Sequence, residues 1–312
     1  LDAGNGVDDQ LVVGDLTATA ANISLTTTGS VLDADDASSG DDTDITAQNL
    51  RIVAGKGIGL LSDNSLGEPV NALEIDVDLL AAKATGSDGL HLVEADGLTV
   101  GDTGDITTEL VASNGPTSTR TALSLSDLVT TATNGADGSI VLQLTTGNLT
   151  LQDGTAPDDN TAVFATGSGN VLLETLGATT TLTAESSAGI ESGNGNLTLK
   201  ANGTVDLQDG VLVATGGSGT ITLLASTGDL TMDPTAEVNT LNGNQILNAG
   251  DDVDDQLVVG DLKATAANIS LTTTGSVLDA DDASSGDDTD ITAQNLRIVA
   301  GKGIGLLSDN SL

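Results

Sequence analysis

The chain contains one long segment twice, and this duplication constrains the fold more than any other feature. Residues 1–66 and 247–312 agree at all but four positions, at a constant offset along the chain. Long internal periods are typical of proteins built from stacked units, each of which contacts mainly its neighbours. We therefore predict that residues 1–246 form one full repeat of a continuous array, that residues 247–312 begin the next, and that the chain is an interior section of a longer protein. The four differing pairs are Asp2 and Asn248, Asn5 and Asp251, Gly6 and Asp252, and Thr17 and Lys263.

Short strands separated by tight turns fill the whole period. Leu, Ile and Val alternate with Thr, Ser, Asp or Asn in segments such as 14–29, 44–57 and 195–210, and Gly with Asn or Asp separates these segments. A period of two predicts strands with one buried face, and Gly with Asn or Asp predicts turns. Frequent Gly disfavours helix, because each interior Gly costs a helix about 1 kcal/mol. The regular alternation also argues against disorder, the alternative suggested by the polar composition.

The scarcity of aromatic residues selects among the all-β folds. The sequence has one Phe and neither Trp nor Tyr, whereas compact cores usually rely on aromatic side chains for buried area. Stacked parallel coils do not need them, because each side chain packs on its equivalent about 4.8 Å away. We predict an all-β fold, a single elongated right-handed parallel β-helix (β-solenoid) without a globular domain. Coils of about 22 residues would give roughly eleven coils and about 50 Å per period.

The alternation also predicts which side chains point into the coil. Residues 72–84 could form a helix by composition, but their apolar residues alternate as in a strand. The residues predicted to point inward are Leu25, Leu32, Ile45, Leu50, Ile52, Leu60, Leu73, Ile75, Val77 and Leu79.

Acidic residues dominate the charge. Eight Lys and Arg against 46 Asp and Glu give a net charge of −38. Such a chain repels nucleic acid, whose binding requires basic grooves and stacking aromatic residues, and it attracts divalent cations. No segment approaches the ~18 apolar residues of a membrane helix. We therefore expect no nucleic-acid partner and no membrane insertion. The absence of cysteine fits either a cytosolic protein or a large bacterial surface protein.

The densest chemical feature is an acidic segment present in both copies. Six carboxylates that lie close together in the chain repel one another unless a hard cation bridges them, and Ca²⁺ takes about 6–8 oxygen ligands. The spacing matches neither the EF-hand loop nor the calcium-binding nonapeptide, so a solvated acidic loop is the alternative interpretation. The candidate Ca²⁺ ligands are Asp33, Asp35, Asp36, Asp41, Asp42 and Asp44, and in the second copy Asp279, Asp281, Asp282, Asp287, Asp288 and Asp290.

Catalytic signatures are weak. His91 is the only histidine, and its position between Leu90 and Leu92 predicts that it points outward. A Ser-His-Asp triad could use only this residue, and no surrounding motif supports one. We therefore predict no enzymatic activity. Five Asn-x-Ser/Thr triplets match glycosylation acceptors, but we interpret them as turn residues, because Asn tolerates turn geometry. They begin at Asn22, Asn148, Asn196, Asn202 and Asn268.

The repeated strand phrases resemble a known family. The segments LTATAANISLTTTGSVLDA, ITAQNLRIVAGKGIGLL and LHLVEADGLTVGD are similar to repeats of filamentous haemagglutinin-type giant exoproteins, which are bacterial surface adhesins with long right-handed β-helical shafts. The resemblance implies secretion, an extracellular or cell-surface location, and a role in attachment or cell–cell contact.

We therefore predict a structural segment of an extracellular filament or giant adhesin shaft without catalysis. Its expected partners are further repeats of a longer chain or copies of itself end to end, and also other cells or surface glycans. The alternative is a β-helical surface protein that binds or degrades polysaccharide. A groove with clustered basic, aromatic and acidic residues would indicate that alternative, but the chain has only three arginines, Arg51, Arg120 and Arg297.

Overall fold

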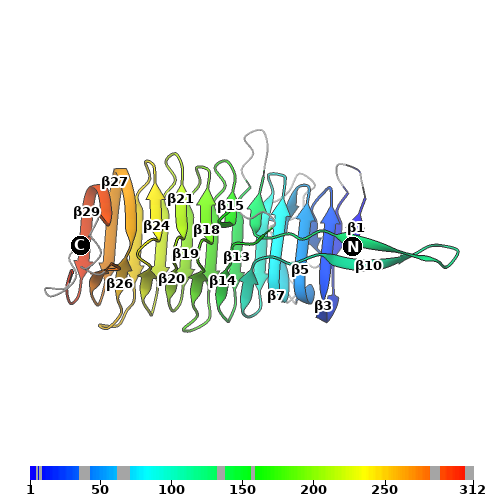
Figure 1. The fold of residues 1–312 in the computed structure, drawn as a ribbon, viewed down its shortest axis with the longest axis horizontal. Helices are drawn as coiled ribbons and strands as arrows, with labels where there is room; N and C mark the ends of the chain where they lie inside the picture. The colour runs from blue at the N-terminus through cyan, green and yellow to red at the C-terminus, as the bar shows by residue number, and fades with distance from the viewer. Residues whose placement is uncertain are drawn as a thin grey trace.

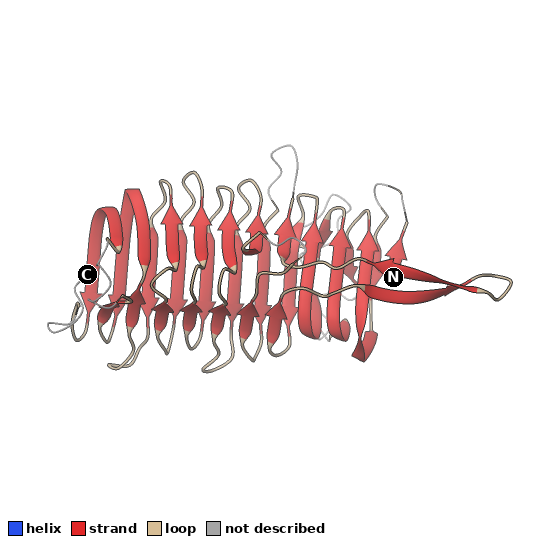
Figure 2. Cartoon of the chain, viewed as in Figure 1, coloured by secondary structure: helices blue, strands red, loops and turns tan. Residues whose placement is uncertain are grey.

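The chain folds into an elongated β-solenoid. A computed structural model describes residues 1–4, 6, 9–34, 43–61, 71–131, 138–155, 159–281 and 289–305. Within these ranges there are 29 strands and no helix (Figure 2), and 27 of the strands form one continuous sheet. The sheet winds into about 10 turns along one axis (Figure 1), which confirms the predicted all-β parallel solenoid. Accordingly, the described ranges contain no helix that is long and apolar enough to cross a membrane.

Each turn adds one strand to each of three parallel ladders, which we call A, B and C. Several long strands bend from one ladder into the next. Ladder A contains β1 (Asp2–Ala3), the second halves of β3 (Leu16–Thr27), β5 (Ile45–Ala54) and β7 (Leu73–Ala84), then β12 (Leu128–Thr130), β15 (Thr161–Ala165), β18 (Gly189–Ser192), β21 (Leu212–Thr215), β24 (Glu237–Thr240), and the first halves of β27 (Asp261–Thr273) and β29 (Ile291–Ala300).

The other two ladders follow the same order along the axis. Ladder B contains β2 (Leu11–Val13), β4 (Val31–Asp33), β6 (Gly57–Ile58), β8 (Gly89–Glu94), β13 (Ile140–Leu144), β16 (Val171–Thr175), β19 (Leu197–Ala201), β22 (Ile221–Ala225), β25 (Gln245–Ala249) and the second halves of β27 and β29. Ladder C contains the first halves of β3, β5 and β7, then β9 (Leu98–Val100), β14 (Leu149–Leu151), β17 (Leu182–Ala184), β20 (Val205–Leu207), β23 (Leu230–Met232), β26 (Leu257–Val259) and β28 (Val277–Asp279).

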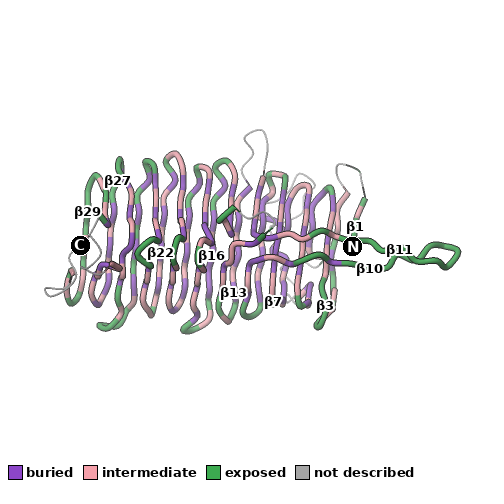
Figure 3. Tube along the Cα trace, in the orientation of Figure 1, coloured by how far each residue is buried: buried purple, intermediate pink, exposed green. Residues whose placement is uncertain are grey.

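The core is a set of stacked aliphatic columns inside the coil (Figure 3). Of the ten residues predicted to point inward, nine are buried. The prediction for Leu32 is wrong nevertheless, because it stacks on the exposed Val12 and faces outward, while Val31 faces the core.

The prediction for Leu79 is also wrong, because this residue is only half-buried and its neighbour Leu80 is fully buried. β7 bends between ladders at the exposed Asp78, and the bend shifts the alternation by one residue. The single aromatic residue, Phe164, faces outward and is half-buried, so the core is aliphatic as predicted.

A column of glycines and a column of asparagines run along the corner between ladders A and B. A Cβ atom at Gly195 would lie 2.0 Å from the Gly169 carbonyl oxygen, and one at Gly219 would lie 2.1 Å from that of Gly195. Only glycine allows this approach of neighbouring turns. Next to this column, Asn196 N donates to Asn170 Oδ1 at 2.8 Å. Asn196 Nδ2 also donates to Asn170 Oδ1 at 3.1 Å, and Asn196 Oδ1 accepts from the Thr220 backbone N–H at 3.0 Å, so the Asn196 side chain is part of a ladder across turns.

The same sequence has different burial in its two copies, according to what lies above or below it. Leu50 is fully buried under β7, whereas its counterpart Leu296 in the last turn is 47% exposed. Conversely, Leu262 is fully buried on β24, whereas its counterpart Leu16 in the first turn is only partly buried. Each copy therefore shows which surface the other would bury if the solenoid continued.

The two copies also lie on different ladders. Leu25 belongs to ladder A and stacks on Ile52, whereas its counterpart Leu271 belongs to ladder B and stacks on Leu247. Eight successive pairings lead from Leu25 to Leu262, and the chain then moves on by one ladder to reach Leu271. The path runs through Leu25, Ile52, Ala82, Leu128, Val163, Ile190, Val213, Val238 and Leu262.

A second path gives the same result. Eight pairings on ladder B lead from Val31 to Ile269, and the counterpart Val277 lies one ladder further, on ladder C. One full period therefore spans eight turns and one third. The coil length expected from the sequence is too short, because many turns are longer. The turn from Ala82 to its stacked partner Leu128 is about twice the expected length.

A hairpin leaves the solenoid between β9 and β12. It consists of β10 (Ile106–Val111) and β11 (Thr117–Ala122), which pair antiparallel. Figure 1 shows it running back along the solenoid and past the first turn at the N-terminal end. Arg51 Nε donates to the Leu123 carbonyl oxygen at 2.8 Å, and Arg120 forms an ion pair with Asp2. The alternating pattern predicts strands here, but not their departure from the coil.

Candidate functional site

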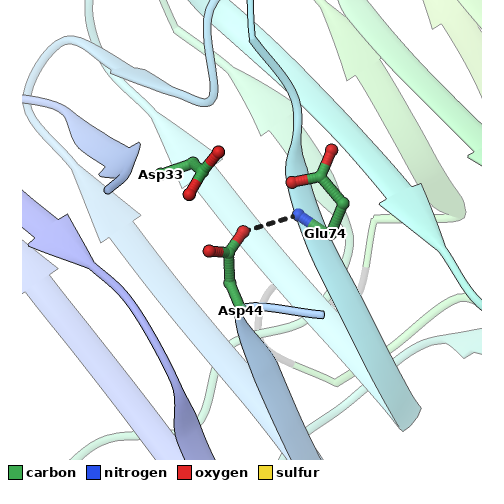
Figure 4. Close-up of side chains that lie close together, drawn as sticks. All are labelled: Asp33, Asp44 and Glu74. Atoms are coloured by element: carbon green, nitrogen blue, oxygen red, sulfur yellow. Dashed lines mark hydrogen bonds between the residues drawn. The ribbon is translucent and has the colours of Figure 1, made fainter. Parts of the chain in front are cut away.

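Three carboxylates from two adjacent turns meet at one edge of the solenoid (Figure 4). Asp33 ends β4, Asp44 directly precedes β5, and Glu74 lies near the start of β7. One oxygen from each carboxylate lies within 4.8 Å of the others. Asp44 Oδ2 accepts a hydrogen bond from the Glu74 backbone N–H at 3.0 Å, and Asn71 Nδ2 donates to Asp33 Oδ2 at 2.5 Å. Backbone pairing between turns thus places the three acids together.

Burial and charge perturb this cluster. The pKa of Asp44 is raised to about 7 by burial and by its hydrogen bond and repulsion with Asp33, although the Glu74 backbone N–H lowers it in part. A carboxylate in such a position gains from a proton or from a cation. An all-oxygen set of this kind suits the hard cations Ca²⁺ and Mg²⁺. The cluster can therefore hold a divalent cation, which would join two adjacent turns.

The second copy forms a related cluster. Asp279 ends β28, Asp290 directly precedes β29, and Asp281 lies in the loop that follows Asp279. One carboxylate oxygen from each lies within 4.8 Å of the others. The Asp281 backbone N–H also donates to Asp279 Oδ1 at 2.8 Å. The two copies therefore share two carboxylate positions, Asp33 with Asp279 and Asp44 with Asp290.

The structure thus brings together five of the twelve candidate ligands predicted from the sequence. The other seven lie outside the described residues: Asp35, Asp36, Asp41, Asp42, Asp282, Asp287 and Asp288. Glu74 was missed by the sequence interpretation, which considered only acids close together in the chain. It occupies an outward position of the alternating segment 73–77, and the register that places it beside Asp44 depends on the lengths of the loops between turns.

A second acidic cluster was also missed. Asp76, Glu94 and Asp96 have carboxylate oxygens within 4.8 Å of one another. Glu94 is fully buried, and its carboxylate accepts hydrogen bonds from the backbone N–H groups of Val77 and Ala95 at 3.3 and 3.0 Å. Burial raises its pKa to about 8, against the backbone hydrogen bonds and with added repulsion from the two aspartates. Its period-two spacing from Leu90 and Leu92 was the available signal for an inward carboxylate.

The single histidine has a backbone partner. His91 is half-buried and outward-facing between buried Leu90 and Leu92, as the alternation predicts. Its Nδ1 lies 2.9 Å from the Leu60 carbonyl oxygen, so Nδ1–H donates to the backbone. This contact ties the imidazole to the preceding turn.

Comparison with protein-family models, with curated proteins and with solved structures gave no match. The fold is that of β-helical repeat proteins in general.

Proposed function

We propose that the chain is a section of the shaft of an extracellular filament or giant adhesin, in which the long repeat recurs. The observation that supports this proposal is that each copy exposes a surface that is buried in the other copy. Leu296 exposes a surface that β7 covers at Leu50, and Leu16 exposes one that β24 covers at Leu262. The turns that follow the first copy therefore fit above the second, and the turns that precede the second fit below the first.

The register sets the geometry of such an array. Eight turns and one third, at about 4.8 Å per turn, give an axial rise of about 40 Å per repeat. The expectation of about 50 Å from the sequence is therefore too large. Each repeat is rotated by about 120° from the one before, because the chain advances by one ladder of three. Orientation would be restored after three repeats, or about 120 Å.

A chain extended by one period tests this proposal. The chain of residues 1–312 followed by residues 67–312 repeats the period in its natural order. We expect its maximum dimension, measured by small-angle X-ray scattering, to exceed that of the original chain by about 40 Å. Cryo-electron microscopy of the native assembly should show a thin unbranched fibre with the same rise and rotation. An unchanged maximum dimension or a discrete particle would contradict the shaft.

The adhesive role and the location extend the same proposal. A rod of stacked coils holds distant groups apart, and the chain supplies such a rod without disulfides. The similarity of its repeats to those of giant bacterial exoproteins supports an extracellular shaft that carries attachment or cell–cell contact. Protease treatment of intact cells tests the location: cleavage without lysis is expected, and protection until lysis would contradict it.

A further inference from the structure

The β10–β11 hairpin, residues 106–122, presents one side to the solenoid. Ile106, Thr108, Arg120 and Ala122 line a groove between this hairpin and the first turns, and Ile106 is buried. Because side chains alternate along a strand, Leu110 faces the same side as Ile106 and Thr108. Leu110 is nevertheless 57% exposed, and the hairpin to which it belongs extends past the first turn (Figure 1).

The second copy shows what would lie beneath this exposed part. Asp2 pairs with Thr26, and in the second copy Asn248 pairs with Thr272 in the same way. One turn further down, Leu224 pairs with Asn248. Leu224 points outward and is half-buried. In a continuous shaft, the position directly below Asp2 is therefore the Leu224 position of the preceding repeat.

The spacing along the hairpin brings the two leucines together. Arg120 lies opposite Thr108 in the hairpin and forms the ion pair with Asp2. Leu110 is two residues beyond Thr108, or about 7 Å, which is about one and a half turns at ~4.8 Å per turn. Below Asp2 this distance reaches the level of Leu224. Ile246, which is 48% exposed on the adjoining strand, adds apolar surface beside it.

We propose that the hairpin is a strap that binds the outward face of ladder B in the preceding repeat, with Leu110 packed on Leu224. This proposal depends on the proposed shaft, because the strap binds a preceding repeat of the same chain. It fastens adjacent repeats by side-chain contacts in addition to the backbone ladders. Since successive repeats are rotated by one ladder, the straps wind around the shaft.

Disulfide trapping in the extended chain tests the strap. The sequence has no cysteine, so Leu224→Cys in the first period and Leu110→Cys in the second give one defined pair. Disulfides form only when the two Cα atoms lie within about 7 Å and the side chains face each other. We expect at least about tenfold more of the intramolecular disulfide than from the matched control, Val111→Cys with Leu224→Cys, because Val111 faces the opposite side of the strap.

The outcomes separate the strap from the shaft. An extended chain that lengthens by about 40 Å but gives equal or no disulfide with Leu110→Cys and Val111→Cys overturns the strap and leaves the shaft intact. A chain that does not lengthen overturns the shaft, and the strap with it. Peptide mapping must place the Leu110→Cys disulfide within one molecule, because a link between two molecules would also overturn the strap.

Discussion

Leu25 and Leu271 occupy the same position in two nearly identical sequences, yet they lie on different ladders of one solenoid. Leu25 stacks on Ile52 in ladder A, and Leu271 stacks on Leu247 in ladder B. The interior therefore accepts the same strand on either of two faces. This equivalence follows from the core, in which every ladder presents aliphatic columns.

The first prediction uses the repeat as its own control. Leu50→Ala should lower the free energy of unfolding by about 2–5 kcal/mol, because it leaves a cavity in a filled column. Leu296→Ala changes the same residue in the same local sequence, but this side chain is 47% exposed, and we expect a loss below about 1 kcal/mol. Urea denaturation measures both. Equal losses would show that burial by the neighbouring turn does not decide the stability of this strand.

The second prediction concerns pH. The pKa of Glu94 is 4.5 in its ordinary state and about 8 in the fold. Between these values the folded chain binds a proton that the unfolded chain has released, so stability falls as pH rises. We expect the melting midpoint to fall by at least about 3 °C between pH 5 and pH 8.5, a shift equivalent to about 1 kcal/mol in a chain of this size.

Glu94→Gln should flatten this dependence, because the amide stays neutral throughout. The remaining slope would come from Asp44 and Asp127, whose pKa values are both raised to about 7 mainly by burial, and from Glu191, whose pKa burial also raises. The matched control is Glu109→Gln, an exposed position on β10, which should retain the full slope. A Glu94→Gln variant with the full slope would refute the assignment.

The third prediction concerns divalent cations. If the cluster of Asp33, Asp44 and Glu74 binds Ca²⁺, a concentration about one hundred times the Kd stabilises the fold by about 2.7 kcal/mol. Calorimetry with Ca²⁺ and with chelator, at matched ionic strength, measures the gain. Asp33→Asn with Asp44→Asn should remove most of it, and Asp78→Asn, an exposed charge on β7, should not. Indistinguishable curves would favour the solvated acidic loop.

The fourth prediction concerns a position that differs between the copies. Lys263 Nζ lies 3.1 Å from Glu237 Oε2 and 3.0 Å from Asp261 Oδ2, whereas the first copy has Thr17 there. Partly exposed ion pairs contribute little, so Lys263→Thr should cost about 0.5 kcal/mol, less in high salt. A double-mutant cycle with Glu237→Gln isolates the pair. Zero coupling energy at low salt would show that the contact does not stabilise the fold.

The sequence alone determined the solenoid and most of its interior. Period-two alternation places aliphatic side chains on one face of each strand, and a chain with a single Phe and neither Trp nor Tyr can bury that face by stacking. Eight of the ten inward predictions follow from this local rule. Leu79 is one exception, because the bend at Asp78 within β7 is a property of the coil's path. Leu32 is the other, because it stacks on the exposed Val12.

The tertiary structure alone decided which turns meet. Glu74 lies beside Asp44 because of the loop lengths between their strands, and no local pattern encodes a register between segments on different turns. The same lengths fix the period at eight turns and one third. The alternation of residues within a strand decides whether a side chain points inward or outward. The lengths of all the preceding loops decide to which ladder that strand belongs. The sequence pattern therefore predicted the interior, but only the structure showed that the second copy lies one ladder further around the shaft.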